Sequence, residues 1–340
     1  MRAIVYSEPG GPEVLRLVER PDPEPGSGEV RVRMRVSGVN PTDWKARRGG
    51  RGGGPLPFPE IVPNQDGAGT IDAVGDGVPA ERVGERVWVW EAAWERVDGT
   101  AQELVVLPAR QAVPLPDEAS FELGASLGIP ALTAQLCLTC SERLPSSLAR
   151  GTLGGRTVLV AGGAGAVGHA AIQLARWAGA RVLTTVSGDE KARLALAAGA
   201  DHVVNYREGD AAAEIRARAP EGVDVVVEVA PAVNAALDAA VIAPNGVVAT
   251  YATDGGHEVA VEAWPLMQRN VRYRFVLVYT VPAEEKVQAV ADVSAALAAG
   301  ALSVGEEEGL PLHRFPLERT ADAHAAVESG TVGKVLIDLA

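Results

Sequence analysis

A glycine-rich turn between a strand-like run and a helix-like run constrains this chain most. The apolar, β-branched segment 157–161 leads into the pattern G-x-G-x-x-G, formed by Gly163, Gly165 and Gly168. Residues 169–178 continue with the apolar spacing of a helix. These glycines permit a tight turn and close approach of a pyrophosphate, which the unpaired N–H groups at a helix N-terminus attract. Because the strand and the helix are both present, we predict a dinucleotide-binding unit rather than a structural turn.

Strand and helix patterns go on alternating after this turn. The expected elements are, in chain order, 181–186, 189–198, 202–204, 210–218, 223–229, 232–240, 246–251 and 272–278. Such alternation predicts a doubly wound parallel sheet of the α/β class. A helix over 283–299 and a strand over 334–339 are expected to close the chain.

The first 115 or so residues have a different pattern. Val30, Val32 and Met34 alternate with Arg31 and Arg33, which is the period of two of a half-buried strand. Similar short runs follow, separated by glycine and proline, as in an antiparallel β domain. The segments 49–59 and 141–153 are expected to be loops.

Length and charge limit the classes of partner. A chain of 340 residues is long enough for two domains, each with its own core. Its net charge of −13 argues against nucleic acid or an anionic membrane as the partner. We find no signal-peptide pattern and no apolar run of the ~18 residues that span a bilayer. We therefore expect a cytoplasmic protein that acts on a small molecule.

The two cysteines form an isolated C-x-x-C, Cys137 and Cys140, in a predicted helix over 130–140. A redox pair and half of a zinc site are the alternatives to buried thiols. A structural zinc needs about four ligands, and the sequence has no second Cys/His cluster. Buried thiols are favoured.

The end of the second predicted strand indicates the choice of cofactor. NAD sites usually have a carboxylate there, which accepts hydrogen bonds from the ribose 2′-OH. Here Ser187 stands at that position and Lys191 follows one helical turn later. Tyr206 and Arg207 could complete a pocket for a 2′-phosphate. Asp189 and Glu190 are evidence for NADH, but acids are common in a first helical turn. We therefore favour NADPH.

Several short motifs, in order and spacing, carry a resemblance that spans nearly the whole chain. They are 38–43 (GVNPTD), 63–69 (PNQDGAG), 83–87 (VGERV), the glycine turn, 198–201 (AGAD), 205–207 (NYR) and 333–335 (GKV). With these motifs the chain resembles the medium-chain dehydrogenases/reductases, specifically the zinc-free quinone oxidoreductase branch that includes zeta-crystallin.

The resemblance implies a GroES-like β domain, formed by residues 1–122 and 279–340, and a Rossmann NADPH-binding domain, residues 123–278. Zinc-dependent relatives carry a cysteine where Asn40 stands and Gly-His-Glu in the stretch 64–67, which here has no histidine. Because an amide is a poor zinc ligand, no metal is expected. A homodimer formed by edge pairing of the cofactor sheets is also implied, with 274–279 as the candidate seam.

By the same resemblance, candidate site residues fall into two groups. The candidate catalytic residues are Asn40, Asp43 and Lys45. The candidate cofactor-binding residues are Asn40, Thr133, Gly163, Gly165, Ala166, Val167, Gly168, Ser187, Lys191, Tyr206, Tyr251, Thr253, Phe275, Val276, Leu277 and Lys334.

Lys45 departs from well-known quinone oxidoreductases, which have a tyrosine at this position. Its ammonium could stabilise enolate charge on an acceptor, or it could be a solvated lysine on a short helix beside Arg47 and Arg48. Trp88 and Trp90 could stack on a planar acceptor, but their i, i+2 spacing favours core packing.

The expected activity is hydride transfer from NADPH to a quinone or a similar electron-poor acceptor, without zinc. Two alternatives remain open. One is an enoyl or alkenal reductase on the same scaffold, and the other is a non-catalytic NADPH-binding protein.

Overall fold

The computed structural model describes residues 1–50 and 55–339. The chain forms two compact units, one of Met1–Ile129 with Leu312–Ala340 and one of Pro130–Pro311. These boundaries differ from the predicted domains, because residues 279–311 pack with the second unit. Helix α9 (Ala283–Ala298) contacts α4 (Ala166–Trp177) there. Its buried Asp292 accepts hydrogen bonds from Gln135 Nε2 at 2.6 Å and from the Leu148 amide at 2.7 Å.

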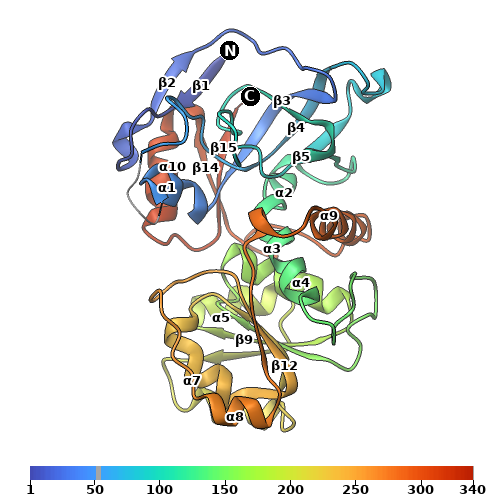
Figure 1. Ribbon diagram of the computed structural model, residues 1–340, viewed down its shortest axis with the longest axis vertical. Helices are drawn as coiled ribbons and strands as arrows, with labels where there is room; N and C mark the ends of the chain where they lie inside the picture. The colour runs from blue at the N-terminus through green and yellow to red at the C-terminus, as the bar shows by residue number, and fades with distance from the viewer. Residues whose placement is uncertain (51–54, 340) are drawn as a thin grey trace. The chain divides into compact units, whose positions relative to one another are not determined.

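The first unit is built on a mostly antiparallel sheet with the strand order β14-β15-β3-β4-β5-β7, and β6 pairs with β3 (Figure 1). The strands are β3 (Glu29–Val39), β4 (Asp66–Val74), β5 (Arg86–Val89), β6 (Leu104–Pro108), β7 (Ala112–Pro114), β14 (Leu312–Pro316) and β15 (Lys334–Asp338). A separate pair joins β1 (Arg2–Val5) to β2 (Arg16–Glu19), and the helices are α1 (Pro41–Arg47), α2 (Phe121–Gly124) and α10 (Thr320–Glu328).

The alternation predicted for β3 is confirmed. Val30, Val32 and Met34 lie in the core of the first unit. Between them Arg31 and Arg33 face outward and share Asp72 on β4, at 2.8 Å each. Of the loop expected at 49–59, residues 51–54 lie outside the described residues.

The second unit holds a parallel sheet in the order β10-β9-β8-β11-β12-β13, with helices on both sides (Figure 1). Its strands are β8 (Thr157–Ala161), β9 (Arg181–Val186), β10 (His202–Asn205), β11 (Val223–Glu228), β12 (Ile242–Thr250) and β13 (Arg272–Phe275). Besides α4 and α9, its helices include α5 (Asp189–Ala197), α6 (Ala211–Arg218), α7 (Pro231–Val241) and α8 (Ala263–Gln268), and α3 (Gly128–Thr139) spans the boundary in sequence. The predicted doubly wound sheet is confirmed.

The strand expected over 272–278 is too long, because β13 ends at Phe275 and a 3₁₀ turn follows at Val278–Thr280. Both cysteines are free, with Cys137 fully buried in α3 and Cys140 partly buried. Burial raises the pKa of the Cys140 thiol to about 11, which disfavours the reactive thiolate. Trp88 and Trp90 are buried in the first unit, as expected. None of the helices that the structure describes is long and apolar enough to cross a lipid bilayer.

Candidate active site

The glycine turn leaves the N-terminus of α4 open. Gly165 is the N-cap of α4 and provides no side-chain hydrogen bond to the first turn. A Cβ added at Gly168 would lie 2.3 Å from the carbonyl oxygen of Gly162, and one at Gly163 would lie 2.2 Å from Thr184 Oγ1. Gly165 is exposed, and its added Cβ would meet only one atom, at 3.5 Å. Packing therefore requires glycine at positions 163 and 168. Gly165 leaves free space above the unpaired backbone N–H groups of the first turn of α4, and this space fits a pyrophosphate.

A second polar group lies at the end of β9. Lys191 Nζ donates a hydrogen bond to Ser187 Oγ at 3.1 Å. The amide of Tyr206 bonds to the carbonyl oxygen of Val186 at 3.1 Å, so Tyr206, which is half exposed, follows β10 beside the same strand end. Asp189 is exposed in the first turn of α5. A lysine and two hydroxyls at this edge are a donor set that fits a phosphate.

The predicted nicotinamide contacts lie at the same carboxyl edge of the sheet. Thr250 and Phe275 are register partners at the ends of β12 and β13, and the Val276 amide bonds to the Thr250 carbonyl at 2.8 Å. Tyr251 and Thr253 follow directly after β12. Of the other predicted nicotinamide contacts, Leu277 is half exposed just after β13, and Thr133 is buried in α3.

In the first unit, Asn40 and Asp43 form the capping box of α1. Asn40 is the N-cap, and its backbone N–H donates to Asp43 Oδ2 at 2.7 Å. Both side chains are almost fully buried. Burial, aided by the nearby carboxylate of Asp66, raises the pKa of Asp43 to about 8.

Two further charged residues complete this buried polar cluster, which consists of Asn40, Asp43, Asp66 and Lys334. Lys334 is 1% exposed, and its Nζ donates to Asn40 Oδ1 at 2.7 Å. Asp66 is 0% exposed, and its Oδ2 accepts from Asn40 Nδ2 at 2.6 Å and lies 3.4 Å from Lys334 Nζ. Burial lowers the pKa of Lys334 and raises that of Asp66, and the attraction between the two opposes both shifts.

The structure does not bring Lys45 into this cluster. Its side chain is exposed, and its Nζ lies 5.6 Å from the ring centroid of Trp44. Arg47 lies on the same helix, where a solvated lysine and its neighbours were one of the alternatives. It is instead fully buried and donates to Glu328 at 2.9 Å.

Asp66 is the member of the cluster that our sequence analysis missed. It lies in the motif at 63–69, but a carboxylate between glutamine and glycine has no pattern that predicts complete burial. Its partner Lys334 is 268 residues away in sequence. Within residues 1–50 and 55–339, no group of three or more His, Cys, Asp or Glu side chains is arranged to hold a metal ion.

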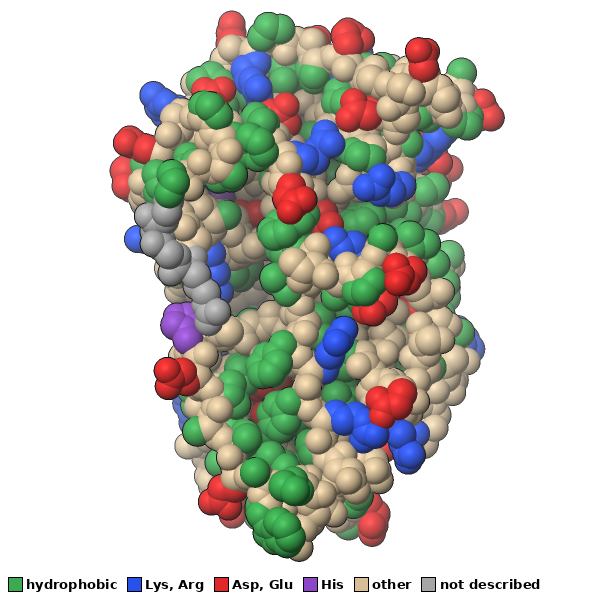
Figure 2. Space-filling view, in the orientation of Figure 1, with side chains coloured by type: hydrophobic (Ala, Val, Ile, Leu, Met, Phe, Trp, Pro, Cys, Tyr) green, Lys and Arg blue, Asp and Glu red, His purple; other side chains and the backbone are tan. Residues whose placement is uncertain are grey.

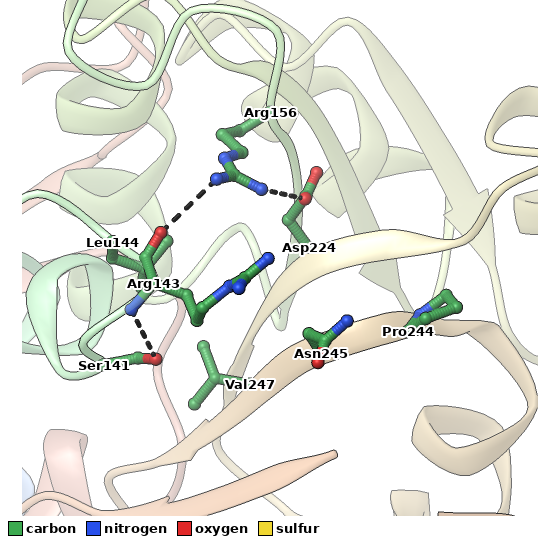
Figure 3. A pocket seen from close by; sticks show the side chains of 8 residues that line it. All are labelled: Ser141, Arg143, Leu144, Arg156, Asp224, Pro244, Asn245 and Val247. Carbon is green, nitrogen blue, oxygen red and sulfur yellow. Dashed lines mark hydrogen bonds and ion pairs between the residues drawn. The ribbon is translucent and has the colours of Figure 1, made fainter. Parts of the chain in front are cut away.

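Figure 3 shows a pocket in the second unit away from these residues. Arg156, Asp224 and Asn245 line it, together with Arg143, whose side chain extends into it. Arg156, Asp224 and Asn245 lie toward the amino ends of β8, β11 and β12, which is the opposite edge of the sheet from the glycine turn. Because of this position we do not assign the pocket to the cofactor that the glycine turn would bind.

Comparisons with known proteins agree with this architecture. Residues 26–117 match the protein-family model described as "Alcohol dehydrogenase GroES-like domain", and residues 166–296 match "Zinc-binding dehydrogenase". The quinone oxidoreductase of Rattus norvegicus is 34% identical over 99% of this chain and 97% of its own length. The chain belongs to the quinone oxidoreductase family.

Solved structures of quinone oxidoreductases have the same fold. The Escherichia coli quinone oxidoreductase complexed with NADPH is 26% identical and has a TM-score of 0.81, with 99% of this chain and 100% of that chain covered. A mycobacterial protein complexed with NADPH is 32% identical, also with a TM-score of 0.81, over 99% of this chain and 100% of that one. The predicted GroES-like domain and Rossmann domain are confirmed, and this quinone oxidoreductase family member is an oxidoreductase.

Proposed function

We propose that this chain transfers a hydride from NADPH to quinones or similar electron-poor acceptors, without zinc. The observation that carries the proposal is the open glycine turn together with the Lys191–Ser187 pair at the end of the next strand. The rat relative named quinone oxidoreductase and the two NADPH complexes support it.

In this proposal the chain binds and orients the cofactor, and NADPH supplies the hydride. Gly163, Gly165, Ala166, Val167 and Gly168 bind the pyrophosphate, and Ser187, Lys191 and Tyr206 bind the 2′-phosphate. Thr133, Tyr251, Thr253, Phe275, Val276 and Leu277 contact the nicotinamide half. We assign Asn40, whose backbone N–H bonds to Asp43 and whose side-chain oxygen bonds to Lys334, to the nicotinamide ribose or the acceptor. A catalytic role for Lys45 stays a prediction, as does a cytoplasmic location.

Two features of the chain support the zinc-free proposal. Asn40 stands at the cysteine position of zinc-dependent relatives, and an amide binds zinc poorly. Its carbonyl oxygen is already bonded to a buried ammonium, that of Lys334, which would repel a metal cation.

The test is NADPH and NADH oxidation with 1,4-benzoquinone, 9,10-phenanthrenequinone, 2-hexenal and a simple aldehyde, with and without a chelator. We expect NADPH-preferring, chelator-insensitive turnover of the quinones. Turnover of hexenal alone would instead indicate an enoyl reductase, and chelator-sensitive aldehyde reduction would contradict the zinc-free proposal. NADPH binding without any turnover would leave a non-catalytic binding protein.

Lys191→Ala is expected to weaken NADPH binding about tenfold or more and to leave NADH binding nearly unchanged. A hydrogen bond to a charged group contributes about 1.5–3 kcal/mol, and NADH lacks the 2′-phosphate. Dissociation constants measured by nicotinamide fluorescence decide this. The matched control is Arg193→Ala on the same helix, because Arg193 pairs with the exposed Glu306. An equal loss of affinity for both cofactors would contradict the assignment.

We also propose a homodimer formed through the edge strand β13. Phe275 on this strand is 64% exposed, and Trp264 and Met267 on α8 are equally exposed. Figure 2 shows hydrophobic side chains gathered on this face of the second unit. Phe275→Asp is expected to give a monomer by light scattering, whereas Val287→Asp, an exposed position on α9, should not. A wild-type monomer at micromolar concentration would contradict this proposal.

A further inference from the structure

Asp66 uses both carboxylate oxygens inside the first unit. Oδ1 accepts from the Ile129 amide at 2.8 Å, and Oδ2 accepts from Asn40 Nδ2 at 2.6 Å. The chain passes so close that a Cβ added at Gly128 would lie 2.2 Å from Asp66 Oδ1. The backbone at 128–129 is therefore shaped around this carboxylate.

Asn40 is held at both ends of its amide by groups of opposite charge. Lys334 Nζ donates to its Oδ1 at 2.7 Å, and Asp66 Oδ2 accepts from its Nδ2. An ammonium can only donate hydrogen bonds and an ionised carboxylate can only accept them. A 180° flip of the amide would set its NH₂ against the ammonium and its oxygen against the carboxylate, so one orientation alone is allowed.

We propose that Asp66 and Lys334 are positioning residues that fix the orientation of the Asn40 amide for the cofactor. The locked amide keeps its second Nδ2 N–H for a ligand. That donor matches a group that accepts a hydrogen bond, such as the oxygen of a ribose hydroxyl. This inference rests on the proposed function, since it assigns the direction in which Asn40 meets NADPH.

A charged pair is costly to bury, so replacing both Asp66 and Lys334 costs less stability than replacing one of them. The double variant therefore separates an effect on stability from an effect on the orientation of Asn40. Asp66→Asn leaves Lys334 without its counter-charge, and Lys334→Met does the same to Asp66, so each single variant should lower the melting temperature. The double variant removes both charges and should recover part of that loss. The double variant still lacks the two charges that fix the orientation of the Asn40 side-chain amide.

The experiment measures melting temperature, the NADPH dissociation constant and kcat for wild type, both single variants and the double variant. We expect the single and double variants alike to show about tenfold weaker NADPH binding and about tenfold lower kcat, although the double variant regains stability. In an Asn40→Ala background the same substitutions should add nothing to either loss. Recovery of affinity and kcat together with stability, or losses that add to that of Asn40→Ala, would overturn the proposal.

Thr100→Val is the matched control. Thr100 is buried, and its Oγ1 donates to the backbone oxygen of Asp66 at 2.6 Å and bonds to Ser37 Oγ at 2.7 Å, rather than to the Asp66 carboxylate. This variant should lose stability and keep NADPH affinity and kcat.

A ligand-free measurement separates this inference from the proposed function. In ¹⁵N-labelled protein, one Asn40 Nδ2 proton should be protected from exchange by Asp66, and Asp66→Asn should abolish this protection. If wild type binds no NADPH, the proposed function fails and the exchange result alone decides the orientation. Equal exchange of the two protons in wild type would overturn the inference.

Discussion

Gly168→Ala is expected to destabilise the second unit by about 1–3 kcal/mol and to abolish measurable NADPH binding. Its new Cβ would lie 2.3 Å from the Gly162 carbonyl oxygen and 3.0 Å from the Gly162 carbonyl carbon. These are backbone atoms, so relief requires α4 to move away from the turn. That movement displaces the amides that we propose as the pyrophosphate site. Urea denaturation and NADPH fluorescence titration measure the two effects.

Gly165→Ala, three residues earlier in the same turn, is the matched control. Its Cβ meets only the Gly162 oxygen, at 3.5 Å, which is an ordinary contact. We expect near wild-type stability with weakened NADPH binding, because the methyl group projects into the space above the open amides. If Gly165→Ala binds NADPH as wild type does, the pyrophosphate does not lie at this turn.

Asp238→Asn is expected to make the protein more stable than wild type at pH 8, on the order of a few kcal/mol. Asp238 on α7 and Glu228 at the end of β11 are both fully buried, and Glu228 is close enough to perturb Asp238. Glu228 Oε1 accepts from Asn234 Nδ2 at 3.0 Å and from the Ala230 amide. Burial and the neighbouring Glu228 raise the pKa of Asp238 to about 8.

The direction of the effect follows from proton binding. Between pH 4 and pH 8 the folded chain keeps the Asp238 proton and the unfolded chain has lost it, so stability falls as pH rises through this window. An asparagine side chain is neutral at every pH in this window, so it neither binds nor releases a proton. The stability gap between variant and wild type should therefore widen from pH 4 to pH 8, as measured by urea denaturation.

Asp189→Asn, an exposed carboxyl in the same unit, is the control and should open no such gap. Asp43, whose pKa is also raised to about 8, gives both proteins a common slope that cancels in the difference. A gap of equal size at pH 5 and pH 8 would mean that Asp238 is ionised in the folded chain.

The sequence predicts the parts of this fold that local patterns determine. The strand 181–186 matches β9 at both ends, and the alternation in β3 identifies its core face, because burial of one strand face imposes a period of two. β13 was predicted three residues too long. Its apolar residues continue to Val278, but the chain turns at Leu277, where Thr280 bonds back to the Leu277 carbonyl.

The polar interior could not be predicted in the same way. Glycine spacing indicated the turn before α4, since that geometry is local. The contacts of Asn40 with Asp66 and Lys334 join three segments distant in sequence, and only the assembled sheet brings them together. The same applies to Asp238, whose helix position reads as a solvated carboxylate until α7 packs over β11.

The pairing of β15 with β3 has a consequence for synthesis. Residues 36–39 of β3 pair with β15 on one side, whereas β6 covers only residues 29–33. While the ribosome is still making the second unit, this edge of β3 has no partner strand. Asn40 and Asp66 also lack the ammonium group of Lys334. The second unit can fold earlier, as a continuous segment. The inserted unit can therefore form before β15 (Lys334–Asp338) is available to complete the sheet of the first unit.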